Sequence, residues 1–110
     1  MQYSASSRFV RISPRKVRAV VDAVKKLSPA VAVEKLQLLS RSAAEPIRKT
    51  LQSAMSNATQ SKKVAIESLK IKNILVDEGA KMRRRDKSHR PGKEGIIQKR
   101  TSHIKVILED

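Results

Sequence analysis

The stretch MRRRDKSHRPGK, Met82 to Lys93, joins two strand-like runs and carries no helical period itself. Six of its twelve residues are Lys or Arg, one is Asp, and only Met82 could face a hydrophobic core. Arg90-Pro91-Gly92-Lys93 fits a type II turn, with Pro at position i+1 and Gly at i+2. The stretch is therefore predicted to be the far end of an antiparallel β-hairpin that leaves the body of the protein.

The runs on both sides of this stretch indicate the strands of the hairpin. The first extends from Val64 to Val76, with a change of phase at Asn73 that a β-bulge would absorb. The second, Ile96 to Leu108, ends in alternating apolar residues. Near the N-terminus, Gln2 to Phe9 indicates a short strand, with Tyr3, Ala5, Ser7 and Phe9 on one side. We expect this strand to join the hairpin base, since an isolated two-stranded ribbon is only marginally stable.

Three helices are predicted between the first strand and the hairpin. Ser13-Pro14 and Ser28-Pro29 are start signals, with Ser as N-cap and Pro at the first helical position. The third helix covers roughly residues 43–60 and begins either after a Ser42 capping box or with Pro46 first. Apolar stripes are formed by Val17, Val20, Val21 and Val24, by Ala32, Val33, Leu36 and Leu39, and by Ile47, Leu51, Ala54, Met55 and Ala58. Small residues at 53–58 would let a neighbouring helix or sheet approach closely.

These elements predict a single α+β domain over residues 1–110, with three helices packed on a small antiparallel sheet of about three strands and a long protruding basic β-hairpin. The globular body would comprise about residues 1–78 and 101–110, and the hairpin about 79–100. With one Tyr, one Phe and no Trp, the core must be aliphatic. The shortage of aromatics also argues against domains that stack single-stranded bases, such as RRM or OB folds.

The charge predicts a polyanionic partner. Lys and Arg number 25 against 10 acids, for a net charge of +15, and this charge is clustered rather than spread. One cluster surrounds the start of the first helix, and the other is the distal hairpin, Lys81 to Arg100, with a net charge of +7. Membrane binding is not expected, because no run approaches the about 18 apolar residues of a span, and Met1 to Val10 lacks the apolar run of a signal peptide.

Catalysis and metal binding find little support. The chain has no Cys, its two His residues, His89 and His103, lie on separate segments, and Asp77-Glu78 is a lone acidic pair in a strand. The sequence therefore predicts no enzyme, no cofactor, no metal site and no small-molecule substrate.

Four motifs resemble a known family. RISPRKVR at Arg11–Arg18, LQSAMSNA at Leu51–Ala58, VDEG at Val76–Gly79 and KRTSHI at Lys99–Ile104 are similar to motifs of large-subunit ribosomal protein twenty-two, bacterial type. The resemblance covers essentially the whole chain in the right order. It implies a monomer within the ribosome that binds ribosomal RNA and neighbouring ribosomal proteins and aids subunit assembly. It also implies a hairpin that lines the peptide exit tunnel, where it meets the nascent peptide and influences the response to macrolides.

Residues expected to contact RNA follow from the two cationic clusters and the matching motifs. They are Arg8, Arg11, Ser13, Arg15, Lys16, Arg18, Lys81, Arg83, Arg84, Arg85, Lys87, His89, Arg90, Lys93, Lys99, Arg100, Thr101, Ser102 and His103. The tip, Lys87–Gly95, departs from the family's Pro-Arg-Ala-x-Gly-Arg-Ala pattern, so individual tunnel contacts are not carried over. The implied location is the ribosome of the cytoplasm, with an organellar ribosome left open.

The alternative is an architectural DNA-binding protein, whose basic β-arm would enter the minor groove with Pro91 as an apolar wedge. That function would need a dimer, and the sequence offers no obvious apolar dimer face.

Overall fold

The structure is a computed structural model that describes residues 2–62, 65–86 and 95–110. Its elements are β1 (Gln2–Val10), α1 (Pro14–Val24), α2 (Pro29–Leu38), α3 (Ala44–Lys62), the 3₁₀ turn η1 (Ile66–Ser68), β2 (Lys70–Glu78), β3 (Met82–Asp86), β4 (Gly95–Lys99) and β5 (Ser102–Glu109). Strands β1, β5 and β2 form an antiparallel sheet in that order, and β3 and β4 form a separate two-stranded ladder. The predicted α+β class is confirmed.

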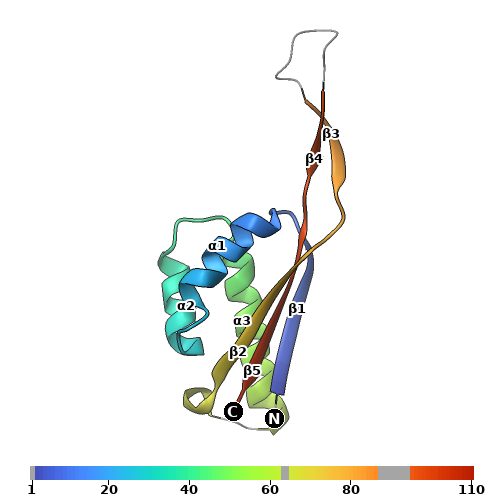
Figure 1. The fold of residues 1–110 in the computed structure, drawn as a ribbon. Coiled ribbons are helices and arrows are strands. Elements are labelled where there is room, and N and C mark those ends of the chain that lie inside the picture. Colours follow the sequence, from blue (N-terminus) through green and yellow to red (C-terminus); the bar gives the residue numbers. More distant parts are fainter. Residues whose placement is uncertain (1, 63–64, 87–94) are drawn as a thin grey trace.

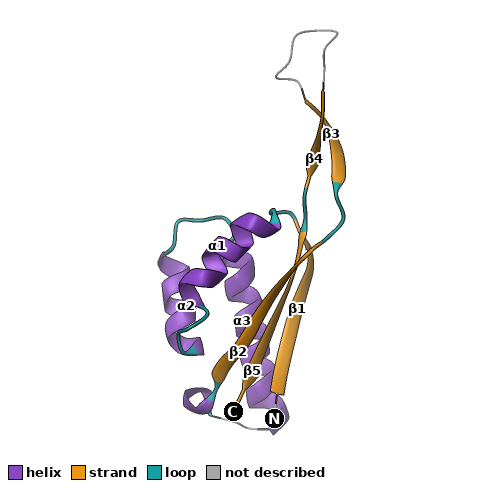
Figure 2. Ribbon diagram, viewed as in Figure 1, coloured by secondary structure: helices purple, strands orange, loops and turns teal. Residues whose placement is uncertain are grey.

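The helices cover one face of the sheet and leave the other open (Figures 1 and 2). Helix α3 packs on β1 and β5, α1 packs against β2, and α2 packs mainly on α3. Along β5 the even-numbered residues from Ser102 to Leu108 are buried, whereas His103 and Lys105 face outward. Because β5 lies between β1 and β2, its inward side chains form the floor of the core.

The core is aliphatic, as the composition requires. Its largest fully buried side chains include Ile47, Leu51, Leu69, Ile104 and Leu108. Ala54 and Ala58 are completely buried on α3, which lies against the sheet. The small residues of α3 therefore serve the close approach of a sheet, one of the two options that the sequence left open.

The helix starts agree with the Ser-Pro signals and refine the third helix. Helices α1 and α2 have Ser13 and Ser28 as N-caps and Pro at the first position. Helix α3 begins at Ala44, so Pro46 occupies its third position, which neither predicted start had proposed. Pro is tolerated there because the first N–H groups of a helix have no intrahelical acceptor.

Strand β2 contains the predicted irregularity. Its register against β5 shifts between Ile71 and Asn73, where the Asn73 side chain accepts a hydrogen bond from the Ile74 N–H at 2.9 Å. The predicted strand character of Ile66 was wrong, since Ile66–Ser68 forms a 3₁₀ turn. Val64 lies outside the described residues.

Strand β1 contains a second irregularity that the sequence analysis missed. The register against β5 shifts between Ser7 and Val10, and Phe9 has φ 56°, in the left-handed region. Phe9 is 61% exposed, so its predicted position on the same side as Tyr3, which is 8% exposed, was wrong. The shift breaks the two-residue alternation on which that prediction rested.

Strands β3 and β4 continue the hairpin beyond the sheet as an arm (Figure 1). Their register runs from Met82↔Lys99 to Asp86↔Gly95. The molecule measures 60 × 24 × 17 Å with a radius of gyration of 16.8 Å, against about 13 Å for a compact domain of this length. The predicted turn at 90–93 lies outside the described residues.

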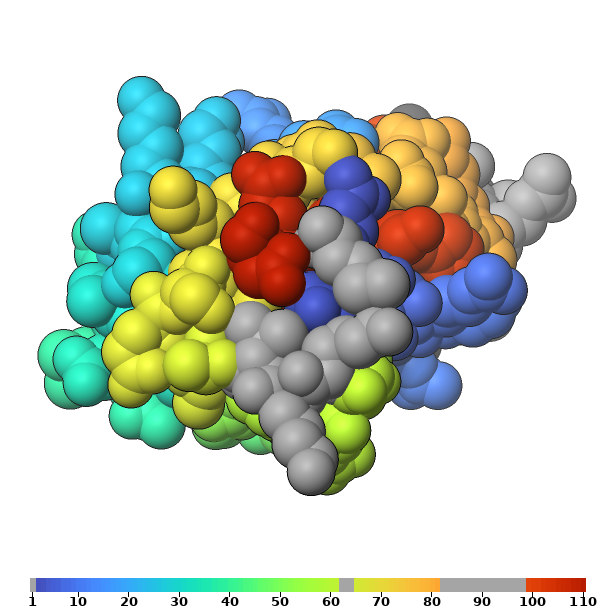
Figure 3. All heavy atoms as spheres, turned by 90° about the horizontal axis from the view of Figure 1, so that it is seen from below, coloured from blue at the N-terminus to red at the C-terminus, as the bar shows by residue number. Residues whose placement is uncertain are grey.

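The end of the molecule away from the arm holds the C-terminal end of β5, bordered by the start of β1 and by residues near 70 (Figure 3). Here Lys70 and Gln2 both pair with Glu109. Among the described residues, no helix is long and apolar enough to cross a membrane.

Candidate nucleic-acid interface

The arm joins the sheet through a tight junction between residues 79–81 and 100–101. The Gly79 N–H donates to the Thr101 carbonyl at 2.9 Å, and the Thr101 hydroxyl donates to the Ala80 carbonyl at 2.7 Å. A Cβ atom on Gly79 would lie 2.4 Å from the Thr101 Oγ1. Only glycine lets the two chains approach this closely, so the junction sets where the arm leaves the body.

A second contact ties the loop between β1 and α1 to the central strand. The hydroxyl of Ser102, which is 0% exposed, donates to the Ile12 carbonyl at 2.5 Å. This bond holds Arg11 and Ser13, on either side of Ile12, beside the root of the arm. Thr101 and Ser102 were both expected to contact RNA, and the structure places their hydroxyl groups in contacts inside the protein.

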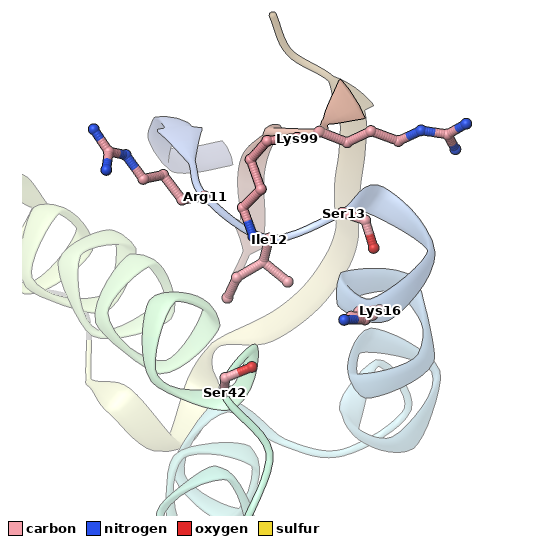
Figure 4. A pocket seen from close by; sticks show the side chains of 7 residues that line it. Arg11, Ile12, Ser13, Lys16, Ser42 and Lys99 are labelled. Carbon is pink, nitrogen blue, oxygen red and sulfur yellow. The ribbon is translucent and has the colours of Figure 1, made fainter. Parts of the chain in front are cut away.

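A pocket of about 260 Å³ lies at this root, between three parts of the chain (Figure 4). Its lining residues are Arg11, Ile12, Ser13, Lys16, Ser42, Lys99 and Arg100. Four of these residues are cationic, two carry hydroxyl groups and none is acidic. The side chain of Lys99 extends into the pocket toward Ile12, whereas that of Arg11 points away from it (Figure 4).

Helix α1 begins at the edge of this pocket. The Ser13 carbonyl accepts the N–H groups of Lys16 and Val17 at 3.1 and 3.2 Å, but the Ser13 hydroxyl makes no capping bond. The first turn contains no acidic residue. A helix N-terminus without a capping side chain or a carboxylate keeps its partial positive charge available for an anion.

The described ion pairs lie away from the pocket. Asp22 of α1 pairs with Lys25, directly after this helix, at 3.2 Å, and Glu45 pairs with Lys49 at 3.1 Å within α3. The hydrogen bond and charge of Lys49 lower the pKa of Glu45. Neither pair includes a cation of the pocket, so these two carboxylates leave the pocket charges uncompensated.

The other predicted residues occupy different places. Arg18 donates to the Val76 carbonyl of the edge strand β2 at 2.9 Å, which fixes α1 to the sheet. His103 lies on the open face of the sheet, where its Nδ1 accepts the Phe9 N–H at 3.1 Å. Arg8, Arg15 and Lys81 are exposed.

Arg83, Arg84 and Arg85 belong to β3, on the arm. Lys87, His89, Arg90 and Lys93 lie outside the described residues. Within the described residues, no group of three or more His, Cys, Asp or Glu is placed to hold a metal ion.

Sequence reasoning missed two features of the interface. Ser42 and Ile12 line the pocket, although the sequence indicated Ser42 only as a possible helix cap and Ile12 only as part of the RISPRKVR motif, because their place at the pocket follows from tertiary packing. Gly79 lies in the quoted VDEG motif, but only the structure gives the physical reason for a glycine there.

Comparison with known proteins places residues 5–109 on the family model described as ribosomal protein L22p/L17e. The large ribosomal subunit protein uL22 of Desulfitobacterium hafniense (strain Y51) is 45% identical over 109 residues, covering 97% of this chain and 93% of the relative. That of Mycoplasma capricolum subsp. capricolum is 40% identical over 111 residues, covering 100% and 98%. That of Deinococcus radiodurans is 41% identical over 106 residues, covering 96% and 78%.

Proposed function

Because the chain belongs to the ribosomal protein L22p/L17e family, it is a structural component of the large ribosomal subunit, and we propose that it acts there by clamping ribosomal RNA between its arm and the start of α1. Membership of this family confirms the prediction that the chain is not an enzyme. With bacterial relatives at 40–45% identity, its place is the ribosome of the cytoplasm. The DNA-binding alternative gains no support, since the relatives named above are ribosomal proteins.

The observation that carries the proposal is the pocket at the root of the arm. Lys16, Lys99 and Arg100 come from two distant segments and surround an uncapped helix N-terminus. An RNA phosphate would meet the positive end of the α1 dipole and flexible cations together there, and each such contact releases counterions. In this proposal, Arg11 and Arg15 extend the cationic surface to neighbouring phosphates.

The arm provides the second part of the clamp. Arg83, Arg84 and Arg85 follow one another along β3, and a two-stranded ladder of this kind buries too little apolar surface to be stable alone in water. RNA is the partner that would neutralise it. We further propose that the arm, residues 79–100, extends to the wall of the peptide exit tunnel and passes close to the nascent peptide, while the body, residues 1–78 and 101–110, remains on the RNA surface.

Thr101 and Ser102 have a positioning role in this proposal. Their hydroxyl groups hold Ala80 and Ile12, which fixes the arm and the β1–α1 loop relative to each other. Preorganised cations lose less conformational freedom on binding than cations that must first be ordered. The clamp would in this way favour a compact arrangement of RNA segments during subunit assembly.

The proposal is tested by removing pocket charges. The double variant Lys16→Gln/Lys99→Gln should weaken binding to large-subunit ribosomal RNA and reduce the steepness of the log–log salt dependence by about 1.4, since each lost phosphate contact removes about 0.7. The control is Lys26→Gln, which changes an exposed Lys just after α1 and outside the pocket. Equal affinities and slopes for the double variant, the control and the unchanged chain would rule out the pocket as a phosphate site.

A further inference from the structure

Phe9 is the single Phe of the chain, and the fold places it on the surface. It is 61% exposed, although the core is short of aromatic side chains and Ser7 and Val10 on either side of it are half-buried. The bulge between Ser7 and Val10 turns Phe9 out of the core-facing side of β1. Bulges that re-aim a side chain in this manner are common beside functional sites.

The backbone at Phe9 is in an unfavourable conformation. Its φ of 56° is uncommon for a residue other than Gly, Asn or Asp. The surrounding structure holds it there: the Phe9 N–H donates to the His103 Nδ1 at 3.1 Å, and the two rings meet edge to face at 4.9 Å between centroids. Strain of this kind persists where neighbours over-determine it and is concentrated at ligand sites.

Phe9 lines a hollow together with outward-facing residues of β1, β2 and β5. The helices leave this face of the sheet open (Figure 2). The hollow has a volume of about 370 Å³, and its lining includes Ser6, Arg8, Asp77, His103 and Lys105. Because the His103 Nδ1 accepts the Phe9 N–H, the neutral ring carries its proton on Nε2 and can donate a hydrogen bond. An aromatic ring, two cations, one carboxylate and polar groups thus line the same hollow.

We propose that this hollow takes one unstacked base of ribosomal RNA, which stacks on Phe9 while Arg8 and Lys105 contact the flanking phosphates. The proposal rests on the proposed function, because it assumes that RNA is the partner, and it adds a contact that reads the face of a base. Unpaired RNA bases are commonly held by aromatic side chains with cations beside them. A protein partner is less favoured, because the exposed cations and the polar lining around Phe9 offer no continuous apolar surface.

The first test uses fluorescence. The chain contains no Trp, so Phe9→Trp introduces a single reporter that a stacked base would quench. Leu38→Trp is the matched control, since Leu38 is 87% exposed on α2 and lies outside the hollow. Titration with full-length large-subunit ribosomal RNA should quench the Trp at position 9 and leave the control nearly unchanged. Equal responses of the two reporters at saturating RNA would overturn the proposal.

The second test separates binding from folding. Phe9→Gly removes the ring and suits a positive φ, so its melting temperature should be unchanged or higher. Its affinity for the RNA should fall about 5- to 150-fold, as expected for the loss of one stacked base. A lower melting temperature with unchanged affinity would mean that Phe9 is only structural, and it would contradict the proposal.

The outcomes also separate this inference from the proposed function. If Phe9→Gly binds RNA as tightly as the unchanged chain and with the same steep salt dependence, the inference fails and the clamp stands. If neither protein shows salt-dependent RNA binding, the clamp itself fails. If the Trp emission responds only when ribosomal proteins are added to the RNA, the hollow binds protein and the inference fails.

Discussion

Single residues at the root of the arm decide how its cations are presented. Gly79 and Thr101 bring the two chains of the hairpin together, and Ser102 holds the β1–α1 loop beside them. The family motifs identified this region from the sequence, but they did not separate residues exposed to a ligand from residues that hold the region together. That distinction depends on burial and hydrogen bonding, which a single sequence does not contain.

Gly79→Ala should destabilise the protein by about 1–3 kcal/mol, as overpacking does, since the added Cβ would lie 2.4 Å from the Thr101 Oγ1. Urea denaturation followed by circular dichroism measures the loss. The control is a double-mutant cycle with Thr101→Ala, which removes the clashing atom. The unfolding free energy lost by the double variant should be smaller than the sum of the losses of the two single variants. Strict additivity of these losses would argue against the clash.

Ser102→Ala should cost about 1–3 kcal/mol of unfolding free energy, because it leaves the Ile12 carbonyl without its donor. The matched control is Ser4→Ala on the same sheet, where the residue is exposed, and its effect should stay within about 0.5 kcal/mol. Equal losses of unfolding free energy for the two variants would show that the buried Ser102 hydroxyl stabilises the fold no more than the exposed Ser4 hydroxyl does.

Secondary-structure elements were well predicted where their periodicity was regular. The four buried Val residues of α1 follow the 3.6-residue period. Helices α1 and α2 both begin at the Ser-Pro pairs that were predicted to start them. Errors arose where an extra residue or a local turn interrupts a period, as at Phe9 in β1 and Ile66 in η1. The bulge at Phe9 is fixed by pairing with the distant strand β5, so the local sequence alone does not determine it.

The two Ser-Pro helix starts allow a matched test of the α1 N-terminus. Ser13→Asp and Ser28→Asp each place a carboxylate at a helix start that has no capping side-chain bond. Both should raise the unfolding free energy by about 0.3–1 kcal/mol through the helix dipole. Only Ser13→Asp should weaken binding to large-subunit ribosomal RNA, because its charge would repel a phosphate at the pocket. An equal effect of both variants on RNA affinity would contradict a phosphate site at α1.

The whole molecule consists of a body, which contains every core residue among those whose burial the structure describes, and an arm that extends beyond the sheet (Figure 1). The buried core residues all lie within residues 3–108 outside the arm, so the sequence could predict the body from its apolar stripes. It could also predict an arm from the charged run between two strands. The placement of the arm relative to α1, and with it the pocket, depends on the junction at Gly79 and was visible only in three dimensions.

Replacing residues 82–99 with a two-residue Asn-Gly turn should leave the body folded. We expect a change in unfolding free energy within about 1 kcal/mol, because the described core residues all lie in the body and the replacement removes mainly like charges that repel one another. Thermal unfolding of the shortened chain measures this. Loss of cooperative unfolding would show that the arm is needed for the fold.

A clamp that neutralises several phosphates makes RNA binding steeply dependent on salt. The association constant of the full chain for large-subunit ribosomal RNA should be measured across a range of salt concentrations, with the shortened chain as a parallel sample. If arm and pocket together neutralise about eight phosphates, the log–log slope should be near −6, given about 0.7 per phosphate, and it should be shallower without the arm. A slope near −1 for the full chain, or the same slope for both proteins, would contradict the clamp.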